Sequence, residues 1–281
     1  FLAISSTSNI AMDILFVKAF NMGIAGVAWA TFLCQSISCI LSIIIVLKRL
    51  HSLKCHEDER VRIFDIHIFG RIAAIAVPSI LQQSFISIGN IIIQSVINGF
   101  GTSVMAGYSA AVKLNNLVIT SLTTLGNGIS NYTAQNLGAG KKERIRPGFF
   151  AGGKLVWIIC IPFIILYWVA GRYLLLLFME QSSTSAIETG MQFLKIISPF
   201  YMIVSIKLVA DGVLRGAGKM GRFMITTFTD LILRVALAIL LSAHYGTAGI
   251  WSAWPIGWCI STTLSVVFFF TGEWKSSRRE I

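Results

Sequence analysis

Polar residues recur every three or four positions along a stretch without proline, from Gly107 to Ala134. This spacing places them on one face of a helix, and at a rise of about 1.5 Å per residue the helix can cross a bilayer core of about 30 Å. The members of this stripe are Ser109, Lys113, Asn116, Thr120, Thr123, Asn127 and Asn131. An unpaired polar group in hydrocarbon costs several kcal/mol, so the stripe faces water or other protein. We predict that it lines a cavity; hydrogen bonding between helices is the alternative.

A second stripe follows the span from Arg71 to Ile97, which contains Pro78. Its members are Ser79, Gln83, Ser87, Asn90 and Gln94, again three or four residues apart. Proline is tolerated in membrane helices where the freed carbonyls find partners, and we expect a kink there. From the two stripes we select four candidate substrate-cavity residues, which are Gln83, Asn90, Lys113 and Asn116. Ile92 and Ile119 are expected to face lipid.

The other apolar segments have similar lengths, and together they predict an all-α polytopic membrane protein with about eight transmembrane helices. The expected helices cover residues 1–20, 27–47, 71–97, 107–134, 157–178, 191–214, 223–242 and 249–271. The composition agrees, since 55% of the 281 residues are hydrophobic and 12% are charged. Soluble domains have about 25% charged residues.

The net charge of +11 reflects membrane topology rather than nucleic-acid binding. Most of the 23 lysines and arginines lie in or beside residues 48–71, 141–154, 215–222 and 275–279. These segments alternate with pairs of apolar spans, as cytoplasmic loops do under the positive-inside rule, whereas residues 180–188 carry no lysine or arginine. We therefore expect the C-terminus in the cytoplasm and 180–188 outside.

Two short repeats indicate how the chain is organised. Gly-Ala-Gly-Lys ends one span at residues 138–141 and another at 216–219. The Gly23, Ala25, Gly26 pattern returns as Gly246, Ala248, Gly249, so the first hairpin is similar to the last one. Repeats on either side of a polar segment are typical of two-lobed transporters. We predict the last two helices of a truncated N-terminal lobe at 1–47, a cytoplasmic linker at 48–70, a six-helix C-terminal lobe at 71–272 and a cytoplasmic tail at 273–281.

The segment from Gln135 to Arg144 reads QNLGAGKKER. With the preceding helix it resembles the MATE (multidrug and toxic compound extrusion) transporters, whose eighth helix has an Ala-rich start, a Lys and a QN-x-GAGK-x-x-R ending. The resemblance implies twelve helices in two six-helix lobes. This chain would then hold helices five to twelve, and four helices would precede it.

Asn9 and Asp13 lie one turn apart on an otherwise apolar helix. A charge near the bilayer centre costs about 2.5–3.5 kcal/mol on insertion scales, so such an aspartate is usually paired or functional. The resemblance implies an ion-coupling role for Asn9, Asp13 and Thr31, which match positions of the first-lobe site in one branch of the family. Either Na⁺ or H⁺ suits these groups, and the alternative is that Asp13 only bonds a neighbouring helix. Some members also carry an acidic residue on helix seven, where this chain has none between Asp65 and Glu143.

The resemblance implies a secondary active transporter that exports organic compounds, cationic or amphiphilic and drug-like, in exchange for Na⁺ or H⁺. A lipid or polysaccharide flippase of the same superfamily is the alternative, and a more cationic cavity would favour it. A membrane-embedded enzyme would need a constellation of nucleophile, base or metal, and we find none. His51, Cys55 and His56 lack a fourth ligand, so we expect no metal site, no cofactor beyond the coupling ion and no catalytic residues. We expect a monomer in a bacterial plasma membrane, with a small-molecule substrate and no nucleic-acid partner.

Overall fold

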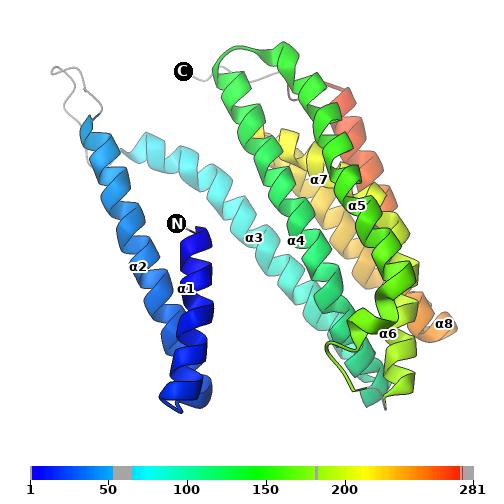
Figure 1. The fold of residues 1–281 in the computed structure, drawn as a ribbon. Helices are drawn as coiled ribbons and strands as arrows, with labels where there is room; N and C mark the ends of the chain where they lie inside the picture. Colours follow the sequence, from blue (N-terminus) through cyan, green and yellow to red (C-terminus); the bar gives the residue numbers. More distant parts are fainter. Residues whose placement is uncertain (1, 53–64, 181–182, 273, 275–281) are drawn as a thin grey trace. The chain divides into compact units, whose positions relative to one another are not determined.

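The computed structural model describes residues 2–52, 65–180, 183–272 and 274, and nearly all of them are helical, with no strand among them (Figure 1). The chain divides into two compact units, Phe1–Asp65 and Ile66–Ile281. Each unit is described by itself. The all-α class predicted from the pattern of apolar segments is confirmed.

The first unit is a helical hairpin. It contains α1 (Leu2–Ile14), a π-helical turn η1 (Leu15–Ala19) and α2 (Gly23–Ser52). The connection is tight, because Asn21 and Gly23 take positive φ angles of 52° and 54°, and the Met22 N–H donates to the Phe16 carbonyl at 3.1 Å. Glycine and asparagine adopt such angles at little cost, which explains why they stand at this turn.

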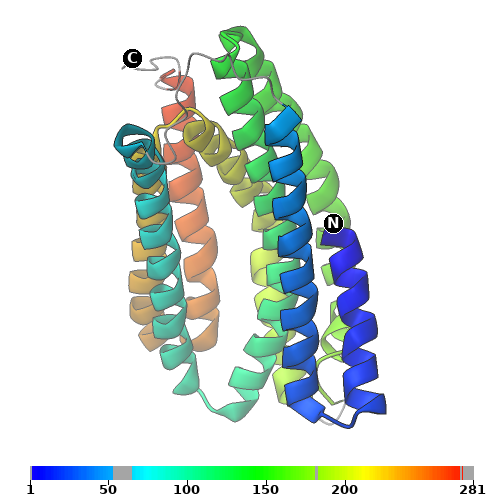
Figure 2. The ribbon, with the colours of Figure 1, turned by 90° about the vertical axis from the view of Figure 1, so that its left-hand side faces the viewer.

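The second unit is a bundle of long helices lying side by side (Figures 1 and 2). Its elements are α3 (Ile66–Asn98), α4 (Thr102–Gly138), η2 (Lys142–Arg144), α5 (Ile145–Leu175), α6 (Thr184–Ile197), η3 (Ser198–Phe200), α7 (Tyr201–Gly216) and α8 (Met220–Phe270). From the turn that joins them, α3 and α4 diverge, and α3 packs along α8 (Figure 2).

The helix α8 is long enough to cross the membrane twice. A continuous helix of 51 residues would run about 77 Å, more than twice a bilayer core. Gly246 breaks it with φ 57° and ψ −138°, and the second half returns along the first. The close pairs show the antiparallel course: a Cβ on Gly249 would meet Leu241, and one on Gly257 would meet Asp230.

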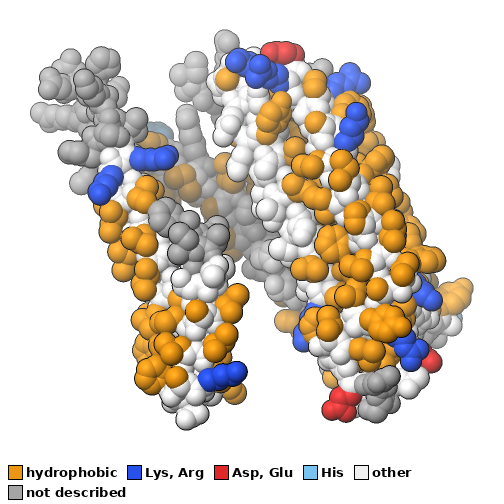
Figure 3. All heavy atoms as spheres, in the orientation of Figure 1, with side chains coloured by type: hydrophobic (Ala, Val, Ile, Leu, Met, Phe, Trp, Pro, Cys, Tyr) orange, Lys and Arg blue, Asp and Glu red, His pale blue; other side chains and the backbone are white. Residues whose placement is uncertain are grey.

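Several observations fit a membrane-spanning bundle. Five helical segments are long and apolar enough to cross a bilayer, which are Gly23–Arg49, Ile66–Asn98, Lys142–Leu175, Thr184–Gly216 and Met220–Phe270. The 37-residue α4 is not among them, because its polar stripe lowers its hydropathy. Figure 3 shows hydrophobic side chains over the middle of the second unit and charged ones gathered toward its ends.

The two Gly-Ala-Gly-Lys segments form the same helix ending. The Lys141 N–H donates to the Asn136 carbonyl at 2.8 Å, and the Lys219 N–H donates to the Leu214 carbonyl at 2.9 Å. In both, the second glycine has a positive φ, 74° at Gly140 and 71° at Gly218. This six-to-one bond over a left-handed glycine is the Schellman motif, so the repeated sequence encodes a repeated stop signal.

The helix boundaries differ from the expected ones at several places; α5, for example, begins at Ile145 rather than at the expected residue 157. The helices extend into the segment predicted as a linker, since α2 continues to Ser52 and α3 begins at Ile66. Polar residues at a helix end can lie beyond the hydrocarbon, so hydropathy alone does not mark where the helix stops. The expected helix 191–214 is divided, because Pro199 lies in the 3₁₀ turn η3 between α6 and α7.

Glycines let α4 and α7 approach closely. A Cβ built on Gly212 would lie 2.5 Å from the Gly126 carbonyl oxygen, and one on Gly126 would lie 2.9 Å from the Leu208 carbonyl oxygen. Both obstacles are backbone atoms, which cannot rotate away as a side chain can. Small residues at such crossings are typical of membrane helix packing, where close contact supplies the association energy.

We predict that Gly212→Ala lowers the stability of the complete protein by about 1–3 kcal/mol, because the added methyl forces α4 and α7 apart. The measurement is thermal unfolding in a neutral detergent. Gly128→Ala is the matched control, since nothing lies within 4 Å of a Cβ at that position on α4. An unfolding temperature for Gly212→Ala equal to that of Gly128→Ala would contradict the tight crossing.

Candidate functional site

A cavity of about 550 Å³ lies within the second unit, between α3, α4, α7 and α8. Its lining is rich in polar groups for a bundle of this hydropathy. The uncharged polar residues that line it are Gln82, Gln83, Asn90, Asn115, Asn116, Thr120, Thr123, Thr124, Asn127 and Thr227. The charged ones are Lys207, Asp211, Arg215, Asp230 and Arg234. In a membrane protein, polar groups gathered this way mark a pathway or binding site for water-soluble groups.

The structure brings three of the four predicted cavity residues together. Gln83 and Asn90 from α3 and Asn116 from α4 line the cavity. Lys113 is not among the lining residues, since its Nζ lies 5.1 Å from the centre of the Phe178 ring. Ile119 lines the cavity, so the expectation that it faces lipid was wrong. Apolar residues also belong to the wall, which polar periodicity alone does not reveal.

The most deeply buried charges of the cavity wall form an ion pair. Lys207 Nζ lies 2.8 Å from Asp211 Oδ2, one turn along α7, with side-chain exposures of 6% and 2%. The other carboxylate oxygen, Oδ1, accepts a hydrogen bond from Ser265 Oγ at 2.7 Å and lies 3.0 Å from Thr226 Oγ1. Asp211 therefore joins both halves of α8 to α7, and its charge is well compensated.

Arg215, one turn beyond Asp211, is held across the cavity. Its Nη2 donates to Asn127 Oδ1 of α4 at 2.9 Å, and its guanidinium carbon lies 5.0 Å from the centre of the Phe223 ring. On the other side, Gln82 Nε2 of α3 lies 3.4 Å from Thr227 Oγ1 of α8. These contacts join α3 and α4 to the charged wall, so the cavity is bounded by side chains that already bond to one another.

Arg234 and Asp230 lie one turn apart on α8, and their spacing predicts mutual neutralisation. The structure contradicts this prediction, because no ion pair or hydrogen bond joins them. Asp230 Oδ1 packs against Gly257, while the Arg234 guanidinium carbon lies 4.5 Å from the centre of the Trp254 ring. The two side chains follow different neighbours on the returning half of α8, and that packing separates them.

Sequence reasoning missed the five charged residues of this wall as site residues. The available signal was the opposite-charge pair at i and i+4 inside an apolar helix, which Lys207 and Asp211 display. A pair of this kind identifies a helix face but not the cavity that it borders. The charged side chains that lie next to one another depend on the path of α8, which reverses its direction after Gly246.

In the first unit, the predicted ion-coupling residues lie near one another. Asn9 Nδ2 is 3.4 Å from Thr31 Oγ1, which joins α1 to α2. Asp13, one turn further along α1, is half-buried, and its Oδ1 has no hydrogen-bond partner. An unpartnered carboxylate oxygen on an apolar helix can accept a proton or bind a small cation.

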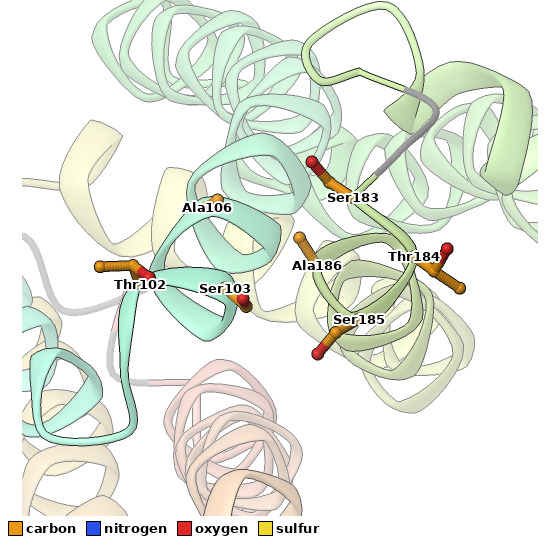
Figure 4. A pocket seen from close by; sticks show the side chains of 7 residues that line it. All are labelled: Thr102, Ser103, Ala106, Ser183, Thr184, Ser185 and Ala186. Atoms are coloured by element: carbon orange, nitrogen blue, oxygen red, sulfur yellow. The ribbon is translucent and has the colours of Figure 1, made fainter.

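A second pocket of about 450 Å³ lies where the first turns of α4 and α6 meet (Figure 4). Small hydroxyl and methyl side chains line it, which are Thr102, Ser103, Ala106, Ser183, Thr184, Ser185 and Ala186. None of these lining residues is charged. Among the described residues, no three His, Cys, Asp or Glu side chains gather as metal ligands. Cys55 and His56 lie outside the described residues, as does the side chain of His51.

Comparison with known proteins identifies a family. The sequence model of the MatE family matches residues 78–240, more than half of the chain. Among curated relatives, the probable multidrug resistance protein YpnP of Bacillus subtilis is 29% identical over 279 residues, which cover 99% of this chain and 61% of that protein. The FAD transporter of Shewanella oneidensis is 24% identical over 211 residues, covering 72% and 43%. YpnP and a second Bacillus subtilis relative match nearly the whole of this chain, but the chain spans only about three fifths of the length of these relatives.

Solved structures of MATE transporters share the fold of this chain. An outward-facing multidrug resistance MATE family transporter of the MOP superfamily superposes with a TM-score of 0.84 at 19% identity, covering 97% of this chain and 62% of that one. A Vibrio cholerae MATE transporter, VcmN, gives a TM-score of 0.85 at 17% identity, covering 98% and 61%. The resemblance noted from the Gln135–Arg144 motif is thereby confirmed.

We predict that Lys207→Met destabilises the complete protein by about 3–5 kcal/mol, because it leaves the Asp211 carboxylate buried without its cation. The double variant Lys207→Met/Asp211→Leu should recover most of that loss, since neither charge then remains. Thermal unfolding of the parent, both single variants and the double variant forms the complete cycle. A double variant as unstable as the sum of the singles would show that the two groups do not interact.

Proposed function

This chain belongs to the MatE family, and from that membership we propose that the complete protein is a secondary active transporter. It exports amphiphilic, drug-like organic compounds in exchange for Na⁺ or H⁺ by alternating access. The observation that carries the proposal is the polar cavity of the second unit, enclosed by helices whose outer surface is apolar. Alternating access exposes such a cavity first to one side of the membrane and then to the other.

The family is one of transporters, not enzymes. Its members among the relatives come from bacteria, and the apolar helices make this chain a multi-pass membrane protein. We further propose a plasma-membrane location and a monomer. We also propose a cytoplasmic C-terminus, supported by the clusters of lysine and arginine at 141–154 and 215–222.

Coupling to an ion gradient requires a group that changes its charge or its ligand during the cycle. Asp13 is suited to this role, since its Oδ1 lacks a partner and the neighbouring Asn9 and Thr31 side chains supply further oxygen atoms. Carboxylate, amide and hydroxyl oxygens are hard ligands suited to Na⁺, and the carboxylate also accepts a proton. We assign Asn9, Asp13 and Thr31 to the coupling site on this basis.

A flippase for lipid or polysaccharide cargo is the second candidate. One observation favours it, because the cavity wall carries three basic side chains and two acidic ones. An excess of positive charge suits phosphate-bearing cargo. A flippase moves its lipid between leaflets, whereas an exporter concentrates a soluble compound across the membrane, so vesicle assays with each cargo separate the two functions.

We predict that Asp13→Asn abolishes gradient-driven export, because the amide keeps the size of the carboxylate but loses its charge and its titratable proton. The variant should insert and accumulate normally and still bind substrate. The measurement is uptake of a fluorescent amphiphile into vesicles under an imposed Na⁺ or H⁺ gradient. Asp65→Asn, at a position outside the helices, is the control and should transport normally. Export at the parental rate by Asp13→Asn would leave Asp13 with a structural role only.

A further inference from the structure

The charges on the cavity wall do not cancel one another. Lys207 and Asp211 neutralise each other at 2.8 Å, and Arg215 is bonded to the neutral amide of Asn127. Asp230 turns one oxygen onto Gly257. Arg234 therefore remains as a cation to which no carboxylate of the described residues is bonded.

The surroundings of Arg234 are unusual for an arginine. Arg234 is only 7% exposed, yet no hydrogen bond or ion pair joins its guanidinium to a described residue, and its Nε is buried without a partner. Its stacking on Trp254 stabilises the charge through the ring face, but it satisfies none of the N–H groups. A guanidinium carries five N–H donors, and a donor buried without an acceptor, as Nε is here, is destabilising. An acceptor that enters the cavity would pair with these N–H donors and stabilise the buried guanidinium.

Two further donors on the wall of the same cavity also lack acceptors. The Trp254 indole Nε1 and the Arg215 Nε are buried without a hydrogen-bond partner, and both residues line the same cavity. Among the described residues of this wall, Asp230 Oδ1 is the only buried side-chain acceptor that lacks a partner. The wall therefore has more buried unpaired donors than buried unpaired acceptors. An anionic ligand supplies acceptors.

We propose, building on the transport function above, that Arg234 and Trp254 form a recognition point for the carboxylate or phosphate group of an aromatic organic anion. The planar guanidinium fork matches the two oxygens of such a group. Trp254, Trp258 and Phe223 supply aromatic wall for the body of the ligand. The cavity thereby selects against organic cations, which the resemblance to the MATE transporters implied as substrates alongside amphiphilic compounds.

The test uses two dyes with the same xanthene ring system and opposite charge. Fluorescein is an anion at pH 8, and rhodamine 123 is a cation. Fluorescence polarisation measures the binding of each to the complete protein in a neutral maltoside detergent. The parent protein should bind fluorescein at least tenfold more tightly than rhodamine 123. A parent protein that prefers rhodamine 123 would overturn the proposal without any variant.

Arg234→Gln should weaken fluorescein binding by about tenfold or more, which is the usual worth of a charge-assisted hydrogen bond, and leave rhodamine 123 unaffected or bound more tightly. Arg234→Lys keeps the charge but loses the fork, so its loss should be smaller. Arg172→Gln, at an exposed arginine of α5 outside the cavity, is the matched control and should match the parent. If Arg234→Gln fails to fold, Trp254→Phe takes its place, and its loss of affinity should be several-fold larger for fluorescein than for rhodamine 123. Unchanged selectivity in whichever variant folds would overturn the proposal.

A lipid headgroup and a soluble compound could both supply the anion. Adding phosphatidylglycerol or phosphatidylcholine to the fluorescein complex separates these sources, since displacement by the anionic lipid alone identifies a lipid anion and retention of the dye identifies a soluble one. Both results agree with an anion site in the cavity and differ only in the source of the anion. Because binding needs no ion gradient, loss of transport with intact anion selectivity would contradict the proposed function and not this site.

Discussion

Hydrocarbon offers polar groups no hydrogen-bond partner, and this constraint determines which face of each helix turns inward. In the second unit the constraint applies most strongly at Asp211, which is 2% exposed and bonds to Lys207, Ser265 and, at 3.0 Å, Thr226. Since these partners come from α7 and both halves of α8, satisfying one carboxylate fixes three helical segments. Removing one partner would leave a buried charge uncompensated, so the loss of this network would also destabilise the packing of the helices.

Close helix packing places this network beside α4. Because Gly126 and Gly212 carry no side chain, α4 and α7 cross near enough for Asn127 to accept a hydrogen bond from Arg215. The break at Gly246 then returns α8 so that Trp254 lies on Arg234. Each of these contacts adds a polar or aromatic group to the same cavity. The site is therefore a product of backbone features at three glycines as much as of the charged residues themselves.

Much of the architecture follows from the sequence pattern. Apolar segments of bilayer length predict the helices, and the polar stripes predict that Gln83, Asn90 and Asn116 share a cavity, where the structure places them. Lys113 shows the limit of this reasoning, because a period of three to four residues defines a face too broad to separate the cavity from the neighbouring contact with Phe178. The charged wall depends on contacts between residues far apart in the chain, such as Ser265 with Asp211, and helical periodicity holds no information about those. Asp230 and Arg234 show the same limit, since tertiary packing overrides their favourable spacing.

Access to water is the most direct measure of whether the face formed by α3 and α4 borders a transport cavity. Single cysteines at Gln83, Asn90 and Asn116 in a cysteine-free complete protein can be treated with a membrane-impermeant, charged thiol reagent. Ile92 on α3, which is outside the cavity lining, serves as the lipid-facing reference. We expect the three cavity positions to react much faster than Ile92 and to be protected by a bound substrate. Equal reaction rates at all four positions would show that this face encloses no water-filled cavity.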